Sequence, residues 1–211
     1  MPWVDVDLVL DHRKAMYVPE SQTLVISDWH LGKVSHFRKH GIGVPGQVRF
    51  ANLEVFDRLM SAYKPDRVLF LGDLFHSDYN LEWEEFGRFI QHYTQVDWLL
   101  VEGNHDIMHP SLYTKFNIRI YKGTLQEGDL LYSHEPLEGD YKGYNLCGHI
   151  HPGVRMVGKG KQSLRLAAFY FSQNRGILPA FGNFTGKHVL KPKKRDRVFV
   201  CSTHQIIPAV R

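Results

Sequence analysis

The sequence predicts an α/β fold in which two β-sheets pack face to face and helices lie outside them. The first half of the chain alternates short apolar runs with segments of helical periodicity. The second half consists mostly of short apolar runs separated by glycine and by charged turns. The 211 residues contain no internal repeat and no long polar linker, so we expect one domain over residues 1–211.

Three runs rich in β-branched and apolar residues form the predicted strands of the first half. They cover residues 23–27, 67–71 and 96–101. Between them, residues 46–63 and 81–93 carry apolar side chains at helical spacing. This half is therefore predicted to follow the order strand, helix, strand, helix, strand.

The second half is predicted to be mostly β-structure, because its apolar runs are short and are bounded by turn residues. A strand-rich half that follows an alternating half indicates two sheets that share one core. The predicted strands cover residues 118–121, 130–133, 144–147, 154–157, 164–171, 177–181 and 198–201.

The composition is that of an ordinary soluble globular protein. Apolar residues make up 43% of the chain and charged residues 23%, which excludes a wholly disordered chain. The first 14 residues have three aspartates among their apolar residues, unlike a signal peptide, and no stretch reaches the ~18 apolar residues of a membrane span. We expect a cytoplasmic protein without membrane association. Cys147 and Cys201 are too few for a disulfide framework and are interpreted as buried thiols.

Five polar motifs each follow a predicted strand. In open α/β sheets such residues converge beyond the carboxyl ends of the strands, even when they are far apart in the sequence. Oxygen and imidazole donors without thiolate suit manganese, iron or zinc, and one carboxylate can bridge two ions roughly 3.5–4 Å apart. The motifs are Asp28-Trp29-His30, Gly72-Asp73-Leu74-Phe75-His76, Gly103-Asn104-His105-Asp106, Ser133-His134-Glu135 and Gly148-His149-Ile150-His151.

In this order the five motifs resemble the calcineurin-like metallophosphoesterase superfamily. The resemblance implies a four-layer α/β/β/α sandwich of two mixed sheets and a single metallophosphoesterase domain. Over residues 23–186 the chain is also similar to the ligase-associated DNA damage response phosphoesterase subgroup, called PdeM-like. That similarity rests on Asp28-Trp-His-Leu-Gly-Lys33, on Phe37-Arg38 with Gly41 and Pro45, on Gly148-His-Ile-His-Pro152 and on Leu178-Pro-Ala-Phe-Gly182.

The resemblance implies two divalent metal ions, with manganese expected and iron or zinc as alternatives. By position in the motifs, one ion would be held by Asp28, His30 and His151, and the other by Asn104, His134 and His149. Asp73 would bridge the two. A hydroxide shared by the ions would attack phosphorus in line.

Further residues receive roles from the same resemblance. His105 corresponds to the family's histidine that stabilises the transition state and protonates the leaving oxygen, and Asp106 would orient it. The motif around His134 departs from the family pattern, because many relatives have glycine where Ser133 and Glu135 stand.

Three side chains near the motifs are candidates for substrate contacts. Lys33 and Arg38 follow the first motif and are candidates for phosphate contacts. His76 is interpreted either as a residue that supports the metal site or as an exposed side chain. The basic stretches 33–40 and 187–197 fit either nucleic-acid contacts or solvated loops.

The spacing of the motifs leaves no room for an inserted cap domain, so the site should be open and should admit a polymer or a large diester. The subgroup resemblance implies a manganese-dependent DNA endonuclease or phosphodiesterase that acts in DNA repair beside a DNA ligase and associated proteins. A phosphodiesterase or pyrophosphatase for nucleotides or other small molecules is the alternative. A non-catalytic scaffold of the same fold is the third hypothesis, and His105 argues against it.

Overall fold

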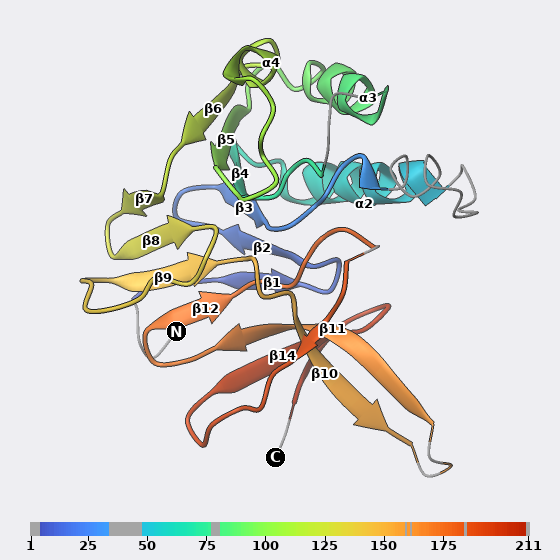
Figure 1. Cartoon of the computed structure of the whole chain (residues 1–211), viewed down its shortest axis with the longest axis vertical. Coiled ribbons are helices and arrows are strands. Elements are labelled where there is room, and N and C mark those ends of the chain that lie inside the picture. Colours follow the sequence, from blue (N-terminus) through green and yellow to red (C-terminus); the bar gives the residue numbers. More distant parts are fainter. Residues whose placement is uncertain are drawn as a thin grey trace.

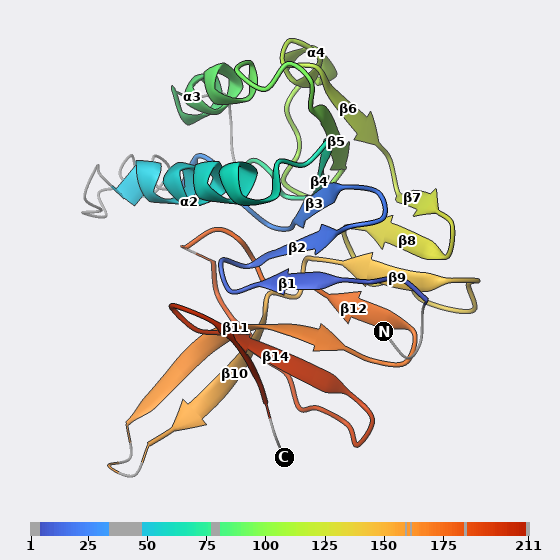
Figure 2. The same cartoon turned by 180° about the vertical axis from the view of Figure 1, so that it is seen from behind.

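The computed structural model describes residues 5–33, 48–76, 81–158, 160, 162–183 and 185–209. Two β-sheets lie face to face, and the helices lie beside the first of them (Figure 1). The view from behind shows the same arrangement (Figure 2). The predicted α/β architecture of two packed mixed sheets is confirmed.

In the described part of the chain, the first sheet has six strands in the order β1-β2-β3-β4-β5-β6. The antiparallel strands β1 and β2 were not predicted; they are short and are joined by a turn in which Lys14 has a φ of 68°. From β3 to β6 the strands are parallel, so the sheet is mixed. The strands are β1 (Val9–Asp11), β2 (Ala15–Val18), β3 (Thr23–Ile26), β4 (Arg67–Leu71), β5 (Asp97–Val101) and β6 (Ile118–Tyr121).

Within the described ranges, three helices connect the parallel strands of this sheet. Helix α2 (Val48–Tyr63) joins β3 to β4, and α3 (Leu81–Ile90) joins β4 to β5. Both match predicted helices, although α3 ends three residues earlier than expected and residues 46–47 lie outside the described part. The short helix α4 (Pro110–Thr114) was not predicted. It begins at a proline, and the side chain of His109 accepts a hydrogen bond at its N-terminus.

The second sheet, as far as its residues are described, has nine strands and is also mixed. Strands β8, β9 and β12 are parallel neighbours. The strand predicted over residues 177–181 differs: β12 ends at Ile177, and Ala180 instead forms a parallel bridge with Ser27 beyond the first sheet. The strands are β7 (Thr124–Glu127), β8 (Leu130–Ser133), β9 (Tyr144–Cys147), β10 (Pro152–Val157), β11 (Ser163–Phe171), β12 (Arg175–Ile177), β13 (His188–Val189), β14 (Arg197–Cys201) and β15 (Ile206–Pro208).

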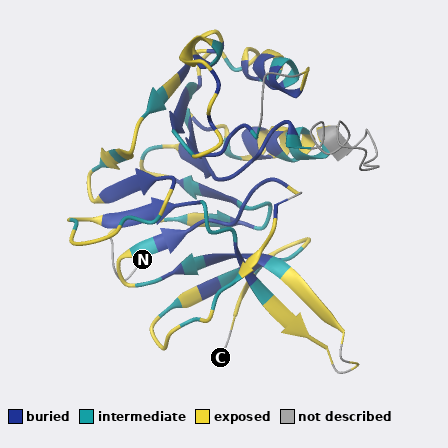
Figure 3. Ribbon diagram, in the orientation of Figure 1, coloured by how far each residue is buried: buried dark blue, intermediate teal, exposed yellow. Residues whose placement is uncertain are grey.

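Alternation along the first sheet separates two apolar cores. In β4, Phe70 packs among the helices, while Leu69 and Leu71 pack toward the second sheet. Successive side chains of a strand point to opposite faces, so a strand buried on both faces is apolar throughout. This is why β3, β4 and β5 are apolar after their first residues, and why Figure 3 shows the middle of the molecule as buried.

The described helices cover only one outer face. Residues of α2, α3 and α4 belong to the core on the first sheet. On the second sheet a small cluster of Ala168, Val198 and Val200 contains strand residues alone. Among the residues described, no helix supplies the fourth layer that the sequence led us to expect. None of the described helices is long and apolar enough to cross a membrane.

Candidate metal centre

The five polar motifs meet at one edge where the two sheets adjoin. Asp28, Asp73 and Asn104 follow β3, β4 and β5 of the first sheet, whereas His134 and His149 follow β8 and β9 of the second. The sheets are joined directly there, since the backbone N–H of His149 donates to both carboxylate oxygens of Asp28, at 3.1 and 3.0 Å. The expected convergence at strand ends is therefore present in the structure.

The loops after β3 and β4 continue the pairing of the strands. The N–H of Asp28 donates to the Gly72 carbonyl at 3.2 Å, and the N–H of His30 donates to the Asp73 carbonyl at 2.9 Å. The buried carboxylate of Asp106 accepts hydrogen bonds from the backbone N–H groups of Phe75 and Gly103, at 3.1 and 2.9 Å. The loops after β4 and β5 are thus held together by the side-chain carboxylate of Asp106, which accepts from a backbone N–H of each loop.

Strained backbone is concentrated in these loops. A positive φ is uncommon for residues other than glycine and costs of order 1–3 kcal/mol when the surroundings impose it. The described chain has nine such residues, and more than half of them are candidate ligands. In the loop after β3, the two side chains with this conformation, Asp28 and His30, have candidate ligand atoms within 4.8 Å of each other. The candidate ligands with positive φ are Asp28 (51°), His30 (54°), Asp73 (49°), His149 (65°) and His151 (50°).

Two glycines of the motifs are required by close packing. A Cβ on Gly103 would lie 2.2 Å from the backbone nitrogen of Asp73. A Cβ on Gly148 would lie 2.2 Å from Ser27 Oγ and 2.5 Å from Asp28 Oδ2. Real Cβ atoms do not approach other atoms so closely, so the glycines let the loops bring their side chains together.

One group of donors consists of Asp28, His30 and His151, whose candidate ligand atoms lie within 4.8 Å of one another. His151 Nε2 is 3.1 Å from Asp28 Oδ1. Neither ring nitrogen of His30 forms a hydrogen bond to the described residues, although both are buried. Burial is the main reason that the pKa of His30 is lowered to about 2, with nearby Lys33 adding to the effect. His30 is therefore neutral, as a metal-binding imidazole must be.

A second group lies around His134. Its Nδ1 donates to the Leu71 carbonyl at 3.0 Å, which fixes the tautomer and leaves Nε2 without a proton, as a metal ligand requires. That Nε2 lies 3.2 Å from His149 Nδ1. Asp73 stands between the groups, because its Oδ2 lies 3.7 Å from His30 Nε2 and its Oδ1 lies 3.5 Å from His134 Nε2.

The comparison with protein families decides what this arrangement is. A family model described as calcineurin-like phosphoesterase matches residues 21–205. The chain belongs to the calcineurin-like phosphoesterase family. No curated protein matches the sequence.

Two solved structures are among those similar to this chain. The Pseudomonas putida nuclease MPE is 25% identical, with a TM-score of 0.81 over 97% of this chain and 96% of that one. The E. coli phosphoesterase YfcE is 13% identical, with a TM-score of 0.43 over 86% of this chain and 88% of that one. As a calcineurin-like phosphoesterase, the protein is a metal-dependent phosphoesterase, and its family uses two metals.

The donor set fits two divalent ions. Two atoms that each lie about 2.1 Å from one ion are about 3 Å apart when they are neighbouring ligands. His134 Nε2 and His149 Nδ1 are 3.2 Å apart, and His151 Nε2 and Asp28 Oδ1 are 3.1 Å apart. Asp28 and Asp73 are 0% and 3% exposed, and their ion-pair partners among the described residues are all histidines. Buried carboxylates without a cation are costly, so bound metal would stabilise them.

His105 and His76 lie beside the donors rather than among them. The ring of the exposed His105 is centred 5.4 Å from that of His30 and 4.9 Å from that of His76. The N–H of His105 donates to Asp73 Oδ1 at 2.8 Å, which fixes the backbone at this point. Of the two interpretations of His76, the structure favours a place at the site, because its ring also lies 5.3 Å from that of His30.

Asp106 does not have the contact that was expected of it. Its two oxygens accept from backbone N–H groups, and within the described residues no hydrogen bond joins it to the His105 ring. Burial raises the pKa of this carboxyl to about 7, although the two backbone donors oppose the shift. The carboxyl group therefore holds the loops that carry Phe75 and Gly103.

The expected substrate contacts are only partly described. Lys33 is half-buried close to the site, and burial lowers the pKa of its ammonium while the charge of Asp73 opposes the shift. Arg38 and the rest of the stretch 34–40 lie outside the described residues. In the stretch 187–197, the N–H of Lys193 donates to Asp196 in a turn between β13 and β14.

Some relevant contacts could not be anticipated from the motifs. Glu135 accepts a hydrogen bond from Asn104 Nδ2 at 2.8 Å, and this bond is the main cause of its lowered pKa. Ser27 donates to Asp28 Oδ2. In the sequence, the only indication that Glu135 has a role at the site was that it stands where many relatives have glycine.

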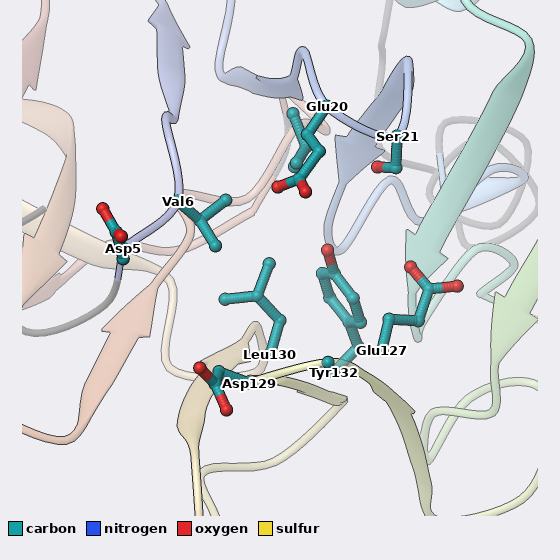
Figure 4. Close-up of a pocket in the computed structure, with 10 residues that line it drawn as sticks. Asp5, Val6, Glu20, Ser21, Glu127, Asp129, Leu130 and Tyr132 are labelled. Carbon is teal, nitrogen blue, oxygen red and sulfur yellow. The ribbon is translucent and has the colours of Figure 1, made fainter.

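A hollow of about 380 Å³ lies at the other ends of β3 and β8 and is lined by Glu20, Glu127 and Asp129 among others (Figure 4). It includes none of the candidate ligands. The acidic lining therefore belongs to a surface separate from the metal centre.

Proposed function

We propose that this phosphoesterase is a two-metal phosphodiesterase that cleaves DNA. The observation that carries the proposal is the similarity to the P. putida nuclease over nearly the full length of both chains, together with two clusters of potential metal ligands in this chain, Asp28-His30-His151 and Asp28-Asp73-His134. The exposed Asn104 and His105 stand at the surface, and an open site of this kind admits a polymer.

The donors divide into two sets that share one carboxylate. Asp28, His30 and His151, whose ligand atoms lie close together, would hold one ion. His134 and His149, whose ring nitrogens are 3.2 Å apart, would hold the other with Asn104, which the motif resemblance assigns to it. Asp73 would contact both, because its two oxygens face different histidines. Two such ions supply a nucleophile from water at neutral pH and offset the charge on the phosphoryl oxygens. Manganese is the metal that we propose, with iron and zinc as alternatives.

His105 would act on the leaving group. Its side chain is exposed beside the first donor set, and its backbone is fixed by the hydrogen bond to Asp73. A histidine in this place can donate a proton to the leaving oxygen, which is worth about 10²–10⁴ in rate. The positive charge of Lys33 would attract the phosphate group of the substrate, and the ring of His76 would lie beside that phosphate. A role beside a DNA ligase in repair, implied by the motif resemblance, is part of the proposal.

The experiment compares substrates and metals. The purified protein is treated with a chelator, reloaded with manganese, iron or zinc, and assayed on bis(p-nitrophenyl) phosphate, p-nitrophenyl phosphate, nicked plasmid and single-stranded DNA. We expect metal-dependent cleavage of the diester and of DNA, with manganese most active. Hydrolysis of small diesters alone would leave the enzyme class intact but contradict the DNA substrate. Diester cleavage that persists without metal would contradict the mechanism.

A further inference from the structure

The residue after His134 is a glutamate, and its side chain lies next to two proposed ligands of the second ion. Glu135 Oε1 accepts a hydrogen bond from Asn104 Nδ2 at 2.8 Å. The same oxygen lies 4.0 Å from His149 Nδ1. Glu135 therefore touches one proposed ligand of the second ion and stands close to another.

The backbone that carries Glu135 is itself fixed. Ser133 Oγ donates to the carbonyl of Glu135 at 2.6 Å and accepts from Asn145 Nδ2 at 2.8 Å. Asn145 is fully buried. The two residues that depart from the family's glycines are thus connected, because Ser133 anchors the turn from which Glu135 extends.

An asparagine offers a metal only one useful end. Its Oδ1 has lone pairs that can bind a metal, whereas its Nδ2 carries two hydrogens and repels a cation. A 180° flip of the side-chain amide exchanges the positions of these two atoms. A carboxylate can only accept hydrogen bonds, so it binds the Nδ2 end. Within the described residues, the side chain of Asn104 makes no other hydrogen bond. Glu135 is the group that selects the orientation of this amide.

We propose that Glu135 is a positioning residue that holds Asn104 with Oδ1 available to the second metal ion. The proposal rests on the proposed two-metal function and deepens it. Glu135 acts through Asn104 and is not itself a catalytic residue. Residues that orient metal ligands typically contribute about 10–100-fold to metal affinity.

The test measures metal binding rather than turnover. Manganese binding is titrated by calorimetry into chelator-treated wild type, Glu135→Ala and Glu138→Ala. Glu138 is an exposed carboxylate three residues along the same loop and serves as the matched control. We expect two ions in the wild type and in the control, and a roughly 10–100-fold weaker affinity for one ion in Glu135→Ala. Equal affinity for both ions in Glu135→Ala would overturn the proposal.

A double-variant cycle tests whether Glu135 acts through Asn104. If it does, adding Glu135→Ala to Asn104→Ala should weaken manganese binding no further. Additive losses would mean an independent role and would overturn the positioning role. Thermal unfolding of the metal-free variants should match the wild type, which separates positioning from a loss of folding. A wild type that binds fewer than two ions would instead refute the two-metal function and, with it, this proposal.

Discussion

His151 Nε2 lies 3.1 Å from Asp28 Oδ1, although the two residues belong to loops of different sheets. Asp28 follows β3 in the first sheet, and His151 directly precedes β10 in the second. One donor set thus depends on how the two sheets pack against each other. Substitution of either side chain should therefore prevent one ion from binding while the protein still folds.

Asp28→Asn should lose metal binding at the first donor set and reduce diester hydrolysis by more than about 100-fold, because changes to residues behind the ligands already cost about 10–100-fold. The rise in thermal stability on adding manganese should also shrink. Calorimetry and thermal unfolding measure both effects. Asp129→Asn, an exposed aspartate at the opposite ends of the strands, is the control. Wild-type metal binding in Asp28→Asn would contradict the assignment.

His105→Ala should slow diester hydrolysis by about 10²–10⁴, since proton transfer to the leaving oxygen is lost. Both ions should remain bound, because the ring of His105 lies beside the donors and is not one of them. Turnover and manganese stoichiometry are measured on the same preparation. His204→Ala, an exposed histidine in the turn before β15, should behave as wild type. Unchanged turnover in His105→Ala would refute its role.

Gly103→Ala should displace Asp73, because the added Cβ would lie 2.2 Å from the backbone nitrogen and 2.5 Å from Oδ1 of that residue. Overpacking of this kind costs about 1–3 kcal/mol of unfolding free energy, and a shift near 1 Å costs about 100-fold in rate. Denaturation and diester hydrolysis measure the two effects. Gly186→Ala is the control, since nothing lies within 4 Å of its added Cβ. Full activity in Gly103→Ala would contradict this prediction, because it would mean that the loop accommodates the added Cβ without displacing Asp73.

Lys14 should make stability depend on pH in the alkaline range. Burial lowers the pKa of its ammonium from 10.5 to about 8, and Lys187 adds to the effect. Below pH 8 both the folded and the unfolded chain carry the proton, so the cost of burying the charge is constant. Between about pH 8 and 10.5 the folded chain releases the proton first, which makes the wild type progressively more stable.

Measured against Lys14→Met, the wild type should therefore gain up to about 3 kcal/mol of unfolding free energy between pH 7.5 and 10.5, at about 1.4 kcal/mol per pKa unit. Groups that do not interact with Lys14 titrate equally in both proteins and cancel. Urea denaturation of the metal-free proteins at several pH values gives the difference. A constant or falling difference would contradict the lowered pKa of Lys14.

The sequence was sufficient for the central elements and for the list of reactive residues. Strands such as Arg67–Leu71 are apolar after their first residue because both faces are buried, and that pattern is local. Polar motifs directly after such strands indicate an edge of a parallel sheet. The apolar pattern did not predict β1 and β2, because these strands are too short to show a period. It also predicted a strand over residues 177–181, where the chain instead leaves the second sheet and Ala180 pairs with Ser27, just beyond β3.

The tertiary structure decided which of these residues meet. Asp28 and His149 are 121 residues apart, so no local pattern relates them, and only the packing of the sheets brings them together. The same packing sets the contact of Glu135 with Asn104 and directs the Asp106 carboxyl to the backbone instead of to His105. Sequence alone determined the chemistry that the five motifs carry. Their mutual orientation depends on long-range contacts and on strained loop conformations that the rest of the fold must impose.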